Sequence, residues 1–154
     1  MQAEEKKVFD GIMKVGVLIG SRAWGVESIN SDYDICVNSD MFSRIETKIL
    51  ELGIDLRPIE YTINRILNTK ACEFKIDNRV INLIEYTDHI LPVIKRVNEM
   101  MIIIRDAGCR DALKDKRARK FAFEGILGLL LPIEMEQMKK DLFDHYKSTL
   151  EPVR

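Results

Sequence analysis

Apolar residues along the chain follow two different spacings, which predict helices and strands in alternation. Residues 3–13 carry apolar side chains at helical spacing and predict a short amphipathic helix. Two apolar runs, at residues 15–19 and 32–37, predict buried strands. The polar stretch 38–40 then offers a helix cap, an apolar stripe follows, and Gly53 stands where a helix commonly ends.

The middle of the chain predicts a short extended element and then a β-hairpin. Residues 54–61 alternate loosely and contain a proline, so a short edge strand or an extended connection is expected. Residues 72–86 form two β-rich runs around Asp77-Asn78, a pair that tolerates the left-handed backbone of a tight turn.

Helices are expected over the rest of the chain. Thr87 or Asp88 can cap a helix whose apolar positions recur on one face as far as Ile104. Gly108 marks a break, after which a helix begins with basic residues and continues with an apolar body. Pro132 opens a last helix, because proline is well tolerated in a first helical turn.

Length and composition predict one globular domain over residues 1–154, of the α/β (α+β) class. The chain is 46% hydrophobic and 32% charged with a formal net charge of -1, which argues against disorder and identifies no partner. The 3 scattered cysteines and 2 distant histidines argue against a disulfide framework and a zinc site. No apolar run has the length of a membrane span and the charged N-terminus does not fit a signal peptide, so a cytoplasmic protein without a membrane partner is expected.

The turn after the first strand is the first candidate for chemistry. An apolar run enters Gly20-Ser21, where glycine lets the backbone turn sharply and approach a ligand. Ser21 is expected at or near the N-cap of a short helix, where free N–H groups can bind an anion such as phosphate.

Two carboxylates follow in the second strand. Asp32 and Asp34 alternate with apolar residues, so both project from one face of a strand with their Cα atoms about 6 to 7 Å apart. Two like charges this close within an apolar run need a cation or a basic side chain beside them. A divalent metal is the first candidate, and a pair that caps a loop or faces water at the strand end is the alternative.

The stretch GSRAWGVESINSDYDI resembles the signature of the nucleotidyltransferase fold of the DNA polymerase beta superfamily. It is similar in particular to the small, single-domain minimal nucleotidyltransferases, including versions encoded by bacteriophages. The expected order of elements is also similar to that family. It runs from a helix and a strand, through the GS turn and the DxD strand, to a helix, a hairpin and C-terminal helices.

The resemblance implies a Mg²⁺-dependent enzyme that moves a nucleoside monophosphate from an NTP such as ATP to a hydroxyl acceptor. The turn of Gly20, Ser21 and Arg22 would hold the triphosphate. Arg22 would pair with a phosphate group bidentately, and a solvated surface arginine is the equally weighted alternative. Asp32 and Asp34 would bind two Mg²⁺ ions, which stabilise the attacking hydroxyl and the leaving pyrophosphate. The acceptor is RNA, a protein side chain or a small molecule, because the fold alone does not choose among them.

The sequence departs from this family at the third carboxylate. The family has an acid in a later apolar strand, where this chain has Asn82, which can coordinate through its carbonyl but cannot act as a base. Glu73 would sit directly across from Asn82 if the hairpin has a two-residue turn. Glu85 lies in the same strand on the opposite face, and Asp88 lies beyond its end. Glu73 is slightly favoured as the third catalytic carboxylate.

A weak or inactive module that binds a nucleotide or a partner is the alternative function.

A basic segment and a single tryptophan remain. Residues 110–120 hold six basic residues and two aspartates and can attract a triphosphate or a nucleic-acid backbone, although such a run is more often a solvated helix face. Trp24, beside the GS turn, can stack on a base, although a single tryptophan is more often packed in the core.

Overall fold

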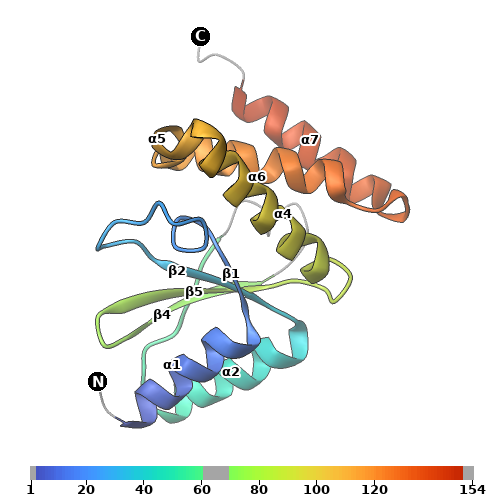
Figure 1. Cartoon of the computed structure of the whole chain (residues 1–154). Helices are drawn as coiled ribbons and strands as arrows, with labels where there is room; N and C mark the ends of the chain where they lie inside the picture. The colour runs from blue at the N-terminus through green and yellow to red at the C-terminus, as the bar shows by residue number, and fades with distance from the viewer. Residues whose placement is uncertain (1–2, 61–69, 151–154) are drawn as a thin grey trace.

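The computed structural model describes residues 3–60 and 70–150, and its centre is a five-stranded mixed sheet (Figure 1). The strands are β1 (Val17–Ile19), β2 (Tyr33–Val37), β3 (Arg57–Pro58), β4 (Ala71–Ile76) and β5 (Arg79–Glu85). Their order across the sheet is β1-β2-β5-β4-β3. β2 and β5 are parallel, and the other neighbouring pairs are antiparallel.

Helices cover both faces of this sheet (Figure 1). α1 (Ala3–Val15) and α2 (Ser39–Glu51) lie together on one face. The opposite face carries α4 (Leu91–Ile104), the π-helix η1 (Arg105–Cys109), α5 (Arg110–Leu113), α6 (Lys116–Leu130), the 3-10 turn η2 (Ile133–Met135) and α7 (Glu136–Leu150). The predicted α/β (α+β) architecture, a small mixed sheet with flanking and C-terminal helices, is confirmed.

The alternation of side chains along the strands decides what faces each layer. Ile35 belongs to the buried core shared with α1 and α2, whereas Cys36 and Ile84 belong to the core shared with α4 and α6. Asp34 and Asn82 each lie two residues before Cys36 and Ile84, so they point toward the second layer. Asp34 and Asn82 therefore face α4 and α6, away from α1 and α2.

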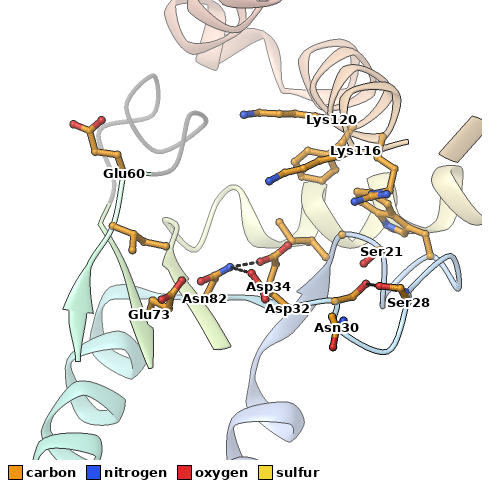
Figure 2. A pocket seen from close by; sticks show the side chains of 17 residues that line it. Ser21, Ser28, Asn30, Asp32, Asp34, Glu60, Glu73, Asn82, Lys116 and Lys120 are labelled. Carbon is orange, nitrogen blue, oxygen red and sulfur yellow. Dashed lines mark hydrogen bonds between the residues drawn. The ribbon is translucent and has the colours of Figure 1, made fainter. Parts of the chain in front are cut away.

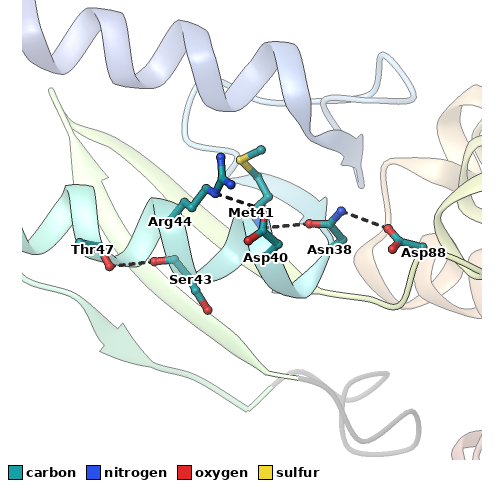
Figure 3. A network of polar contacts seen from close by, with 7 residues as sticks. All are labelled: Asn38, Asp40, Met41, Ser43, Arg44, Thr47 and Asp88. Carbon is teal, nitrogen blue, oxygen red and sulfur yellow. Dashed lines mark hydrogen bonds and ion pairs between the residues drawn. The ribbon is translucent and has the colours of Figure 1, made fainter.

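The cap of α2 has the form that the sequence predicts (Figure 3). The Asn38 side-chain oxygen accepts from the Met41 N–H at 2.9 Å, and Gly53 after the helix has a φ of +73°. Asn38 also donates through Nδ2 to Asp88 Oδ1 at 3.0 Å, so it joins the start of α2 to the segment after β5. Asp88 is therefore held beyond the C-terminal end of β5, away from the paired Asp34 and Asn82.

The hairpin has the predicted register. Asp77 and Asn78 have φ values of +48° and +63°, which suit a two-residue turn. Glu73 is therefore directly opposite Asn82. The edge strand expected within residues 54–61 is β3, and Tyr61 at the end of that range lies outside the described residues.

Two local predictions are wrong. Ser21 does not open a helix, because residues 21–25 form consecutive turns in which the Gly20 carbonyl accepts from the N–H groups of Ala23 and Trp24. Thr87 and Asp88 do not cap α4, whose N-cap is Ile90 without a side-chain cap.

The break at Gly108 is as predicted, whereas the last α-helix begins at Glu136, after a 3-10 turn, and not at Pro132. Gly108, with a φ of +110°, interrupts the helical path inside η1, and Pro132 precedes η2 and α7. Among the described residues, no helix has the length and apolar character needed to cross a bilayer.

Candidate functional site

A cavity of about 620 Å³ lies between the sheet and α6 (Figure 2). Its wall brings together polar residues that are far apart in the sequence. They include Ser21, Asp32, Asp34, Glu73, Asn82, Lys116, Arg119 and Lys120, and Gly20 of the turn also lines the wall. Five of the six residues predicted for the site therefore share one cavity, and Arg22 is not part of its wall.

The two aspartates share one hydrogen-bond donor. Asp34 lies in β2 directly opposite Asn82 of the parallel β5, and Asp32 immediately precedes β2. Asn82 Nδ2 donates to Asp34 Oδ1 at 2.9 Å and to Asp32 Oδ2 at 3.2 Å. The carboxylates are thus close enough for one positively polarised group to bridge them.

The environment of Asp34 shifts the pKa of its carboxyl upward. Burial raises the pKa of its carboxyl above the ordinary 3.8, and the charge of Asp32 raises the pKa further. The hydrogen bond from Asn82 lowers the pKa, as do the charges of Lys116 and Arg119. Burial is the largest of these effects, so these donors and charges compensate the carboxylate only in part. A divalent cation would supply the missing compensation.

Gly20 joins the turn to the acidic pair. Its φ of +82° is accessible to glycine at little cost, and a β-carbon there would lie 2.7 Å from Asp34 Oδ2. The Asp34 carboxylate therefore lies directly against the backbone of the GS turn, where Ser21 is also buried. The turn and the carboxylates form one site.

Two arginines from the helical layer hold the end of this turn. Arg105 donates through Nη1 to the Trp24 carbonyl at 2.9 Å, and Arg110 donates through Nη1 to the Gly25 carbonyl at 3.0 Å. A β-carbon at Gly25, whose φ is +69°, would lie 2.5 Å from Arg105 Nη1. These contacts fix the turn relative to η1 and α5.

Asn98 of α4 ties the same turn to β1. Its side chain accepts from Trp24 Nε1 at 2.9 Å and donates to the Leu18 carbonyl at 2.8 Å. The Trp24 ring packs against Phe123 of α6 with 5.6 Å between ring centroids, and only 3% of Trp24 is exposed. Trp24 is therefore a core residue, as the commoner alternative predicted, although it also forms part of the cavity wall.

Arg22 stabilises the loop before β2. Its Nε donates to the Ser31 carbonyl at 2.8 Å, and its guanidinium lies 4.2 Å from the centre of the Tyr33 ring. In the structure Arg22 therefore stabilises the loop beside the cavity and does not line the cavity itself.

The basic start of α6 faces the carboxylates across the cavity (Figure 2). Lys116, Arg119 and Lys120 recur at helical spacing on the side of α6 that leads to the buried Phe123. Arg119 also donates to the Lys114 carbonyl at 2.8 Å, so it closes the start of the helix. The sequence alone favours a solvated face for this segment, whereas in the structure these three residues line the cavity together with Phe123. Their helical spacing with Phe123 is the sequence signal that could have indicated a cavity wall.

The candidates for a third carboxylate are separated. Glu73 lines the cavity on β4 and is ion-paired with Arg57 of β3. Glu85 is three residues beyond Asn82 on β5 and is not part of the cavity wall, and Asp88 is bonded to Asn38. Among the described residues, no group of three His, Cys, Asp or Glu side chains is arranged to hold a metal ion.

The donor set fits Mg²⁺. Mg²⁺ commonly takes one or two carboxylates, with substrate phosphates and water filling its other positions. Asp32 and Asp34 supply the carboxylates. Asn82 Oδ1 is a buried oxygen that, within the described part of the chain, has no hydrogen-bond partner.

Comparison with known proteins adds little to this geometry. No family model matches the sequence, and no curated protein gives a significant match. A solved structure described as "Structural Basis for the Activity of a Cytoplasmic RNA Terminal U-transferase" is similar over 83% of this chain and 46% of that chain. The sequence identity is 13% and the TM-score is 0.38, so this similarity carries no argument about function. This chain spans less than half the length of that protein.

Proposed function

We propose that the chain is a Mg²⁺-dependent nucleotidyltransferase that transfers a nucleoside monophosphate from an NTP to a hydroxyl acceptor. One observation carries the proposal: the GS turn, a pair of aspartates and a basic helix face line one cavity. A metal-bound triphosphate is stabilised by carboxylates that hold the metal and by positive charge beside the phosphate oxygens. The cavity offers both.

Asp32 and Asp34 are the proposed Mg²⁺ ligands, in a site for one or two ions. Bound Mg²⁺ supplies neutralisation of the charge that develops on the reacting phosphate. Gly20 gives the carboxylate of Asp34 room to lie against the turn, and the buried Ser21 offers its hydroxyl and backbone to the triphosphate.

Lys116, Arg119 and Lys120 are proposed to bind the phosphate oxygens from α6. Burial lowers the pKa of Lys120. The negative charge of a bound triphosphate would raise that pKa again, because it stabilises the protonated ammonium group. The walls of the cavity exclude part of the surrounding water, so each charge interaction inside is stronger than at an open surface. The acceptor is proposed to be RNA, a protein side chain or a small molecule.

The test is transfer of radiolabel from each of the four α-labelled NTPs, with Mg²⁺, to total RNA, total protein and small-molecule fractions of a cell extract. We expect labelling of one fraction by the wild-type protein and none by an Asp32→Ala/Asp34→Ala double variant. EDTA should remove the signal. If the wild-type protein labels nothing with any NTP, catalysis is refuted.

A second candidate is a module that binds a nucleotide without transferring it. The amide of Asn82 favours this alternative, because it occupies the row between Asp34 and Glu73 and cannot accept a proton as a base. Calorimetry with Mg²⁺ and a nonhydrolysable NTP distinguishes the cases. Binding without transfer supports the module, and absence of binding contradicts both candidates.

A further inference from the structure

We propose that the Asn82 side chain has two working orientations. In one, Nδ2 donates to Asp32 and Asp34. In the other, the amide is turned so that Oδ1 faces a divalent cation on the two aspartates and Nδ2 donates to Glu73. This inference rests on the proposed function, because it assigns roles to Asn82 and Glu73 toward the same Mg²⁺ site.

The first orientation satisfies only half of the amide. Nδ2 donates at 2.9 Å and 3.2 Å to the two carboxylates. Oδ1 is buried and has no hydrogen-bond partner among the residues that the structure describes. A buried amide oxygen without a donor is unfavourable, so this orientation is held mainly by the need of Asp32 and Asp34 for positive charge.

The second orientation has a partner for Nδ2 already in place. Glu73 lies directly opposite Asn82 in the antiparallel β4–β5 pair and lines the same cavity. Figure 2 shows Glu73 on the side of Asn82 away from the aspartates. Cross-strand neighbours of this kind have their β-carbons within about 4.5 to 5.5 Å. An ionised carboxylate there can accept from Nδ2, and Arg57 holds that carboxylate in position.

A cation would reverse the preference between these orientations. Beside Asp32 and Asp34, a divalent ion repels the positively polarised N–H groups of Asn82 and attracts its oxygen. Once the Asn82 amide has rotated, Oδ1 contacts the cation and Nδ2 contacts Glu73, so both halves of the amide are satisfied. Glu73 then acts as a positioning residue through Asn82, which replaces its predicted role as the third catalytic carboxylate.

NMR spectroscopy of the wild-type protein tests the rotation of the Asn82 amide directly. NOEs from the Asn82 side-chain NH₂ protons are recorded during addition of MgCl₂, first alone and then with a nonhydrolysable ATP analogue. We expect contacts to the Asp32 and Asp34 β-protons to give way to contacts to the Glu73 γ-protons. If Mg²⁺ shifts the resonances of Asp32 and Asp34 while the Asn82 contacts stay unchanged, the two-orientation model is wrong and the proposed metal site stands. If Mg²⁺ shifts neither aspartate, the metal site and this model are both wrong.

Mg²⁺ affinity in two backgrounds gives an independent test. Glu73→Met should weaken Mg²⁺ binding about tenfold in the native background, because the turned amide loses its acceptor. In an Asn82→Asp background, the carboxylate presents an oxygen to the cation in either orientation, so Glu73→Met should not weaken Mg²⁺ binding. Glu85→Met, which removes a carboxylate outside the cavity wall, is the control and should have little effect in either background. Equal weakening by Glu73→Met in both backgrounds would overturn the model.

Discussion

A side chain at position 20 is unfavourable for two separable reasons. Its positive φ disfavours any β-carbon, and the carboxylate of Asp34 occupies the space that the β-carbon would need. Gly53 has a similar φ of +73°, and no atom of the described residues lies within 4 Å of an added β-carbon there. The chain therefore contains a natural control for the backbone effect alone.

We predict that Gly20→Ala and Gly53→Ala both lower the free energy of unfolding, by about 1 to 2 kcal/mol for the backbone effect. Gly20→Ala should in addition weaken Mg²⁺ binding at least about tenfold, because the Asp34 carboxylate must move. Urea unfolding and Mg²⁺ calorimetry measure the two effects. Equal Mg²⁺ affinities of the two variants would contradict the assigned contact.

A pH dependence follows from the raised pKa of Asp34. The native state keeps this proton to a higher pH than the unfolded chain, where the ordinary value is 3.8. The contribution of Asp34 to stability therefore falls as pH rises from about 3.8 through its higher native pKa.

We predict that Asp34→Asn gains stability relative to the wild-type protein as pH rises from about 3.8 toward neutral. Added Mg²⁺ should narrow the gap by stabilising the wild-type carboxylate. Asp55→Asn, at an exposed position, is the control and should show no such trend. A difference between wild type and Asp34→Asn that does not change with pH would refute the effect.

At the scale of elements, the sequence predicts the parts whose geometry is fixed locally. The Asp77-Asn78 turn determines the hairpin register, so the pairing of Glu73 with Asn82 could be deduced before the structure was known. The cap and terminal glycine of α2 are equally local. The contacts of Arg22 were harder to predict from the sequence, because a loop without periodicity brings Ser31 and Tyr33 near it.

The basic start of α6 shows why a site is harder to predict than an element. Its charges were visible in the sequence, but the surface opposite them was not, because that surface belongs to β2 and β5 more than 30 residues earlier. Tertiary packing turns this charge run into a cavity wall.

We predict that Lys116→Glu/Lys120→Glu weakens NTP binding at least about tenfold, since both charges line the cavity. Lys114→Glu is the control, because Lys114 is exposed and pairs with Asp111 at 3.2 Å outside the cavity wall. Arg119 is left unchanged, since its bond to the Lys114 carbonyl also supports the helix start. Titration of each variant with an NTP and Mg²⁺ measures the effect, and equal affinities of the two variants would contradict the assignment.

At the scale of the whole molecule, the site depends on two layers at once. β1 and β2 carry the turn and the aspartates, whereas α4, η1 and α5 hold the turn through Asn98, Arg105 and Arg110. Neither layer alone fixes the position of the turn. Such long-range dependence is the part of the site that local sequence patterns could not provide.

We predict that Asn98→Leu costs about 2 to 4 kcal/mol of stability, because it leaves Trp24 Nε1 and the Leu18 carbonyl without their partner. The neighbouring exposed change Glu99→Leu should stay within about 0.5 kcal/mol of wild type. Denaturant midpoints for both variants test this. A similar loss in both would show that the surface of α4, and not the bond network, is responsible.

The place of Trp24 gives the protein a built-in optical reporter. It is the 1 tryptophan of the chain, its indole is buried in the wall of the cavity, and its N–H is fixed by Asn98. A nucleotide entering the cavity changes the polarity around that ring, so the emission spectrum of the unlabelled protein should respond to binding. Occupancy can then be followed by fluorescence in real time, with every variant described above, without attaching a dye.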